Sequence, residues 1–120
     1  MIAIDTMRAV VTWLGESLPA GFGLREVGPG RYLVSSNCRG ADDSWELVVP
    51  LDETDSTLRS AIDTVLSEVQ DYVAEETTSQ WPPSPGASGL PLPDVEIDAN
   101  SGRVRAGYRS GREWILSFDI

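Results

Sequence analysis

Residues 57–76, TLRSAIDTVLSEVQDYVAEE, carry the longest helical pattern in the chain. Their apolar residues recur every three or four positions, which places them on one stripe at 3.6 residues per turn. Thr54, Asp55 or Ser56 is available as the N-terminal cap, and the pattern runs to about Glu75. The expected buried residues are Leu58, Ile62, Val65, Leu66, Val69, Tyr72 and Val73. This stretch predicts an amphipathic helix with one face in a core.

A shorter helix and three strands precede it. Asp5 or Thr6 caps the helix, and Pro19 follows its end. Its apolar stripe consists of Met7, Val10, Val11, Leu14 and Leu18. Strands are predicted at 24–27, 31–38 and 45–51, with Gly28-Pro29-Gly30 as the first turn.

Three more strands are predicted after a proline-rich loop, Trp81–Pro93. They span 94–98, 103–108 and 113–120, and glycine-containing turns separate them at 100–102 and 110–111. The inward residues are expected to be Val95 and Ile97, then Val104, Ala106 and Tyr108, then Trp114, Leu116, Phe118 and Ile120.

The predicted element order is α-β-β-β-α-loop-β-β-β, in a single domain covering residues 1–120. An antiparallel sheet with two helices packed on one face would bury every apolar stripe, so the fold class is α+β. Helix followed by strands occurs twice, but the two halves share no repeat at the residue level. The order resembles that of small secretion-chaperone-like α+β proteins, a likeness of fold only.

The chain is strongly acidic: 19 aspartates and glutamates face nine basic residues, all arginine, for a net charge of −10 over 120 residues. Nucleic acids and anionic membranes bind mainly through basic residues, so neither is an expected partner. A basic protein would be attracted. The sequence has no signal-peptide pattern and no apolar run of membrane-spanning length, which favours the cytoplasm. Both a monomer and a homodimer remain open.

Residue types needed for most catalysis are missing. The chain has no histidine, which excludes imidazole bases and histidine-ligated metals, and the single cysteine, Cys38, cannot form an internal disulfide. The acid pairs Asp42-Asp43 and Asp52-Glu53 lie in predicted polar turns rather than in a cleft. We therefore expect no cofactor, no metal and no catalytic residue, which favours a protein that is not an enzyme.

Residues 98–102, Asp-Ala-Asn-Ser-Gly, look like the start of a calcium-binding loop, but the residues that follow do not fit one. An EF-hand loop closes with a glutamate at its twelfth position, and that position is Arg109. The stretch is better interpreted as a hairpin turn.

The long helix has an unbalanced polar face. Glu68, Asp71 and Glu75 fall within about a sixth of a turn of one another, since each residue advances 100°. Residues 42–76 contain eleven acids and one base. These three acids are either a partner-binding surface for a basic protein or a solvated face that keeps the protein soluble.

The C-terminal strands carry a second charged candidate. Arg103, Arg105 and Arg109 alternate with inward residues, so they are expected on the outer face of the sheet. They would bind a phosphate or carboxylate, or pair with the protein's own acids.

A short resemblance covers QDYVAEE, residues 70–76, and WPPSPG, residues 81–86. This segment resembles one in uncharacterised small proteins of high-GC bacteria, where Q-D-x-V-x-E precedes W-P-x-x-P-G. The resemblance implies a helix entering a fixed Trp-Pro loop and implies no activity. Those proteins often carry cysteine and histidine in and after the second half. Here Ser84, Ala87 and Ser88 stand there, so no metal or redox role is carried over.

Two functions follow from these observations. The first is a non-enzymatic interaction module, such as an immunity protein, antitoxin-like inhibitor, adaptor or small chaperone, that binds a basic partner through Glu68, Asp71 and Glu75. The second is a small-molecule or anion-binding protein, or a minor enzyme. Its site would lie between the sheet and the 81–93 loop, with Trp81, Tyr108 or Trp114 as walls and an arginine as anchor.

Overall fold

The computed structural model describes residues 2–37, 42–49, 55–83, 91–98 and 100–119, with residues 2–4 and 55–57 described through their backbone only. Its helices and strands, in chain order, are α1 (Ile2–Ser17), β1 (Phe22–Gly28), β2 (Arg31–Ser36), β3 (Asp43–Val48), α2 (Asp55–Thr77), β4 (Leu92–Ile97), β5 (Val104–Ser110) and β6 (Glu113–Asp119). The α+β class and the predicted element order are confirmed. Element ends coincide with the prediction or differ from it by up to four residues, since the sequence signals for ends are weaker than those for the elements themselves.

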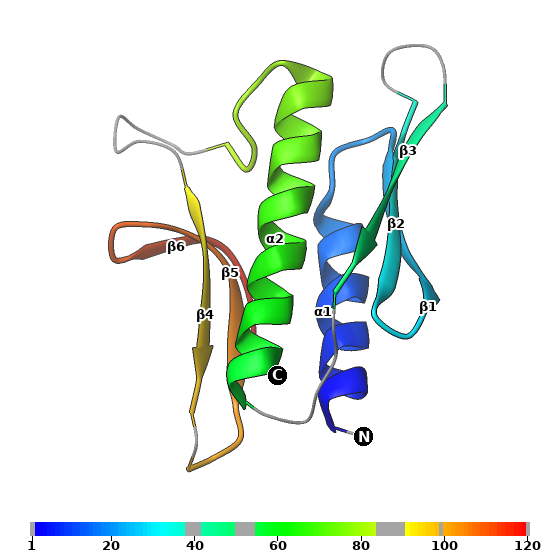
Figure 1. Ribbon diagram of the computed structural model, residues 1–120. Coiled ribbons are helices and arrows are strands. Elements are labelled where there is room, and N and C mark those ends of the chain that lie inside the picture. The colour runs from blue at the N-terminus through cyan, green and yellow to red at the C-terminus, as the bar shows by residue number, and fades with distance from the viewer. Residues whose placement is uncertain (1, 38–41, 50–54, 84–90, 99, 120) are drawn as a thin grey trace.

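Two sheets replace the single predicted sheet. Strands β1, β2 and β3 form one antiparallel sheet in that order, and β4, β5 and β6 form the other. The helices lie side by side between them, with α1 beside the first sheet and α2 beside the second (Figure 1). The sheets do not merge because β4 runs along α2, where Arg59 donates to the Val95 carbonyl and Gln70 Nε2 donates to the Pro91 carbonyl at 2.6 Å.

The core lies where the two helices meet the inner faces of both sheets. The predicted stripes of α1 and α2 are buried there, except that Leu18 and Tyr72 are only partly buried. Contacts also link each helix to the opposite half: the rings of Trp13 in α1 and Phe118 in β6 stack at 5.6 Å. The chain therefore folds around one shared core rather than two.

One strand-face prediction was wrong. Trp114 was expected to share an inner face with Leu116 and Phe118, but the β5–β6 register shifts between Tyr108 and Arg109. Tyr108 pairs with Leu116 while Arg109 pairs with Trp114, so β6 contains one extra residue at this point. Such a bulge reverses the alternation of side chains. Trp114 therefore lies on the outer face, next to Arg105 and Arg109.

The predicted turns are confirmed where they are described, but the proline-rich loop ends earlier than predicted. Gly102 and Gly111 both have positive φ, 73° and 61°, which the hairpin turns require. Residues 84–90 of the loop lie outside the described residues, and the last part of the predicted loop belongs to β4.

Two buried tyrosines test the contribution of a single hydrogen bond. Tyr32 and Tyr108 are both 0% exposed. The Tyr108 hydroxyl donates to the Leu66 carbonyl at 2.7 Å, whereas the Tyr32 hydroxyl has no hydrogen-bond partner among the described residues. We expect Tyr108→Phe to lower the free energy of unfolding by about 1 kcal/mol and Tyr32→Phe to leave it unchanged or raise it. Urea unfolding measures both, and equal losses would contradict the assignment.

Candidate functional site

The acidic face of α2 consists of Glu68, Asp71 and Glu75, and all three side chains are exposed as the helical spacing predicts. Within the described residues, neither Glu68 nor Asp71 forms an ion pair. The nearest base in sequence, Arg59, lies on the other side of α2, where it donates to the Val95 carbonyl of β4. The acidic face is thus presented to solvent by a helix whose opposite side is fixed in the core.

Strand β3 lies against one border of this face. The Tyr72 hydroxyl, on α2, donates to Asp43 Oδ2 at 3.1 Å, and the Tyr72 ring meets Phe22 edge-on at 6.2 Å. Strand β3 and α2 run in opposite directions (Figure 1). Two residues along a strand advance about 6.6 Å and four along a helix about 6 Å. Trp45, on the same side of β3 as Asp43, therefore lies about level with Glu68.

Trp45 is unusual for its exposure. It is 56% exposed, and Val48, at the end of the same strand, is 67% exposed. Sequence reasoning placed Trp45 in a strand but missed its exposure, because Trp45 and the buried Leu47 follow the same alternation. The neighbouring acids Asp42, Asp43 and Glu46 were the available signal, since three charges in five residues are typical of a strand at the edge of a sheet.

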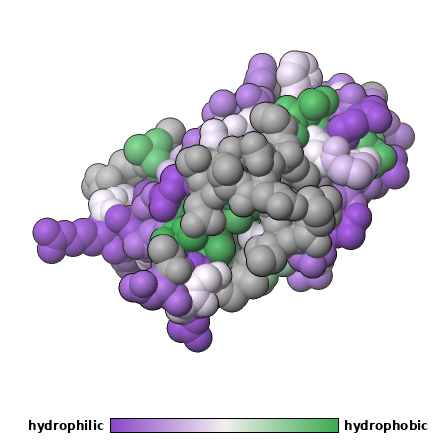
Figure 2. All heavy atoms as spheres, turned by 60° about the horizontal axis from the view of Figure 1, so that its bottom comes forward, coloured by the Kyte–Doolittle hydropathy of each residue, from purple (hydrophilic) through white to green (hydrophobic). Residues whose placement is uncertain are grey.

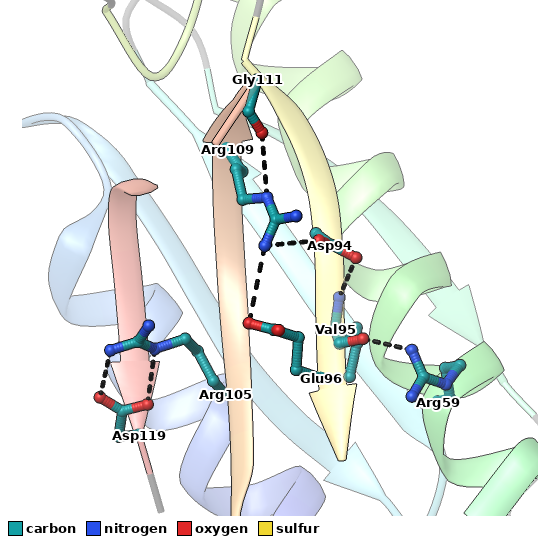
Figure 3. A network of polar contacts seen from close by, with 8 residues as sticks. All are labelled: Arg59, Asp94, Val95, Glu96, Arg105, Arg109, Gly111 and Asp119. Atoms are coloured by element: carbon teal, nitrogen blue, oxygen red, sulfur yellow. Dashed lines mark hydrogen bonds and ion pairs between the residues drawn. The ribbon is translucent and has the colours of Figure 1, made fainter. Parts of the chain in front are cut away.

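The outer face of the second sheet carries Arg105 and Arg109, and Figure 3 shows both engaged with the protein's own acids. Arg105 binds both oxygens of Asp119, at 2.8 and 3.2 Å, which lowers the pKa of that carboxyl. Arg109 Nη1 lies 3.3 Å from Asp94 and 3.6 Å from Glu96, and Arg109 Nε donates to the Gly111 carbonyl. Both guanidinium groups also lie within 5.4 Å of the Trp114 ring centroid. Two of the three predicted anion-binding arginines are therefore already paired.

Arg103 is exposed and borders an open hollow of about 450 Å³. The hollow is lined by Glu96, Asp98, Arg103, Val104, Arg105 and Asp119. Three acids face two bases in this lining, so its charge does not favour an anion.

The walls proposed for a small-molecule site do not meet around a common cavity. The rings of Trp81 and Tyr108 pack edge to face at 5.2 Å inside the core. Trp114 lies on the opposite face of the sheet, next to Arg105 and Arg109. The described residues therefore do not place these three side chains around one pocket, and residues 84–90 of the 81–93 loop lie outside the described residues.

The remaining predicted candidates have structural surroundings or fall outside the described residues. The Asn100 amide and the Ser101 hydroxyl donate to Asp98 at 2.9 Å, which lowers its pKa and closes the hairpin turn. Cys38 and Asp52-Glu53 lie outside the described residues. Among the residues that are described, no three metal-ligating side chains are grouped, and no helix has the length and apolarity to cross a membrane.

Outside the grey residues, the side drawn in Figure 2 is mainly hydrophilic, with some hydrophobic residues among the hydrophilic ones. Comparison with protein families, curated proteins and solved structures found no match for the chain. The distinctive features of the described surface are therefore its acidic face on α2 and the exposed side chains of Trp45 and Val48.

Proposed function

We propose that this chain is a non-enzymatic interaction module that binds a basic protein partner across the acidic face of α2, Glu68, Asp71 and Glu75. The observation that carries the proposal is the exposed indole of Trp45, which shares a face of β3 with Asp43, the residue that Tyr72 of α2 contacts. Tryptophan is enriched among the residues that dominate protein interfaces. Carboxylates beside it select a basic partner and speed its association.

The distribution of charge supports this placement. The paired arginines of the second sheet neutralise acids on their own sheet, Asp94, Glu96 and Asp119. On the acidic face of α2, by contrast, neither Glu68 nor Asp71 forms an ion pair with a described residue.

Charge reversal on this face tests the proposal against a partner captured from native lysate and identified by mass spectrometry. The variant Glu68→Arg, Asp71→Arg, Glu75→Arg is compared with Asp5→Arg, Glu16→Arg, Glu113→Arg, which makes the same change in net charge at exposed acids elsewhere. We expect association of the first variant to be at least about tenfold slower than that of the second at low salt. The difference should shrink at 1 M salt, where the screening length falls to about 3 Å.

Thermal unfolding checks that both triple variants remain folded. If the two variants associate at the same rate, the effect belongs to the overall field and the acidic face of α2 is only a solvated surface.

Trp45→Ala should change the dissociation rate constant rather than the association rate constant. An apolar contact made after encounter contributes to the lifetime of the complex, so we expect dissociation to be about tenfold or more faster and association nearly unchanged. Because the side chain is more than half exposed, stability should fall by less than about 1 kcal/mol. Surface plasmon resonance separates the rates, and unchanged dissociation would remove Trp45 from the site.

A further inference from the structure

The free edge of β3 is regular enough to receive another strand. Its six residues pair with β2 without any register shift, and it pairs with no other described strand. The Val49 amide donates to the Gly30 carbonyl at 2.8 Å, which fixes the alternation of hydrogen bonds in this ladder. Asp43, Trp45 and Leu47 accordingly face β2 with their backbone groups. Ser44, Glu46 and Val48 direct their N–H and C=O groups to the free edge.

The other three edges are obstructed. In β4, Pro93 lacks an N–H, and the Val95 carbonyl accepts from Arg59. In β1, the register shifts between Glu26 and Gly28, and the strand lies close to α1, with the Leu24 carbonyl 3.1 Å from a Cβ placed on Gly15. In β6, the bulge next to Trp114 interrupts the strand. Natural edges are blunted by such features, and β3 lacks a proline and a bulge.

Exposed apolar side chains stand on both sides of this open edge. Trp45 points to the side facing α2, and Val48 points to the outer side. An added strand contacts both sides at once, because its own side chains alternate. It would continue the sheet past β3 on the side where Tyr72 meets Asp43, so its inward side chains would cover Glu68 and Glu75.

The charge of the surroundings identifies the occupant. A second copy of this chain would bring another net charge of −10 against the same edge. Glu46 on β3 is already matched by Arg31 at 2.7 Å, whereas Glu68 on α2 forms no ion pair with any described residue and is left to be met by the incoming strand. Arginine suits these inward positions, since guanidinium both pairs with carboxylates and stacks on indole.

We infer that an extended basic segment of the partner docks by adding an antiparallel strand to β3, with arginines facing α2 and apolar residues facing outward. The inference rests on the proposed function, because the acids of α2 supply its charge complement. In antiparallel order, the residues opposite Ser44, Glu46 and Val48 share their outward face and donate to them. The apolar residues of the segment, and not its arginines, therefore make the backbone hydrogen bonds.

Peptide backbone methylation tests this directly on the unmodified protein. The probe is a seven-residue peptide of alternating arginine and valine that begins and ends with arginine. One version carries N-methyl groups on its three valines, and a matched version carries three on its arginines. We expect the N-methylvaline peptide to bind at least about tenfold more weakly than the unmodified peptide and the N-methylarginine peptide to bind within about threefold of it. Hydrogen exchange at the Ser44, Glu46 and Val48 amides should slow when the unmodified peptide binds.

The outcomes separate the two proposals. Equal affinities of the two methylated peptides, or no added amide protection, would overturn strand addition. Loss with N-methylarginine alone would overturn the antiparallel order. No binding of the unmodified peptide at about 1 mM would overturn strand addition alone, since the acidic face is tested with the captured partner.

Discussion

Gly107→Ala is expected to destabilise the fold by about 3 kcal/mol or more. A Cβ at this position would lie 2.0 Å from the Leu116 carbonyl oxygen and 2.7 Å from the Ser117 Cα. Both atoms belong to the backbone of β6, so no side-chain rotation relieves the contact. Strand β6 would have to move away from β5, which breaks the ladder that holds Phe118 against α1.

Gly28→Ala is the matched control. Gly28 also lies in a strand, but a Cβ there meets its nearest atom, Cδ of Arg31, at 3.7 Å, an ordinary contact. Restricting the unfolded chain should make this variant neutral or slightly more stable. Urea unfolding of both variants measures the difference. A loss under about 1 kcal/mol for Gly107→Ala would mean that β6 does not approach β5 as closely as the structure has it.

The outer face of the second sheet is self-contained. On β5, Gly107 stands between Arg105 and Arg109, where the backbone of β6 lies too close to admit a side chain. Both arginines lie over the Trp114 ring while binding acids on β4 and β6. Charges and aromatic surface on this face are thus satisfied within the chain. The edge of β3 is different, because Trp45 and Val48 remain exposed there.

Helices and turns were predictable because their signals are local. The period of 3.6 in α2 depends only on neighbouring residues, and its stripe from Leu58 to Val73 is buried as expected apart from Tyr72. The same rule predicted the exposure of Glu68, Asp71 and Glu75. Positive φ at Gly102 and Gly111 follows from turn chemistry that the sequence displays.

Relations between strands were not predictable from the same rules. Alternation places Trp114, Leu116 and Phe118 on one face. The sequence of β6 contains no signal for the bulge that turns Trp114 outward. The position of β4 beside α2 involves two α2 side chains: Arg59 donates to the Val95 carbonyl in β4, and Gln70 donates to the Pro91 carbonyl just before it. Exposure of Trp45 depends on β3 being an edge, which is a property of the whole sheet. The acids of α2 were therefore predictable from the sequence, whereas the exposed Trp45 on β3 could be identified only from the structure.

Val69→Ala is the second large stability effect expected. Val69 is 0% exposed and lies in the core cluster in the middle of α2. Removing two buried methyl groups costs about 0.8 kcal/mol each in transfer free energy, and the cavity left between packed elements adds to this. We expect the free energy of unfolding to fall by about 2–3 kcal/mol. Urea unfolding should show a lower midpoint with an unchanged slope.

Ser60→Ala provides the control on the same helix with the same new residue. Ser60 is exposed, and alanine has the higher helix propensity, so stability should be unchanged or rise by about 0.5 kcal/mol.

The comparison also bears on the candidate site, because Val69 follows Glu68 and its burial determines which way the acids of α2 face. If Val69→Ala is as mild as Ser60→Ala, the helix is rotated from the position described. Glu68, Asp71 and Glu75 would then point toward the core, and the proposed docking face of α2 would have no basis.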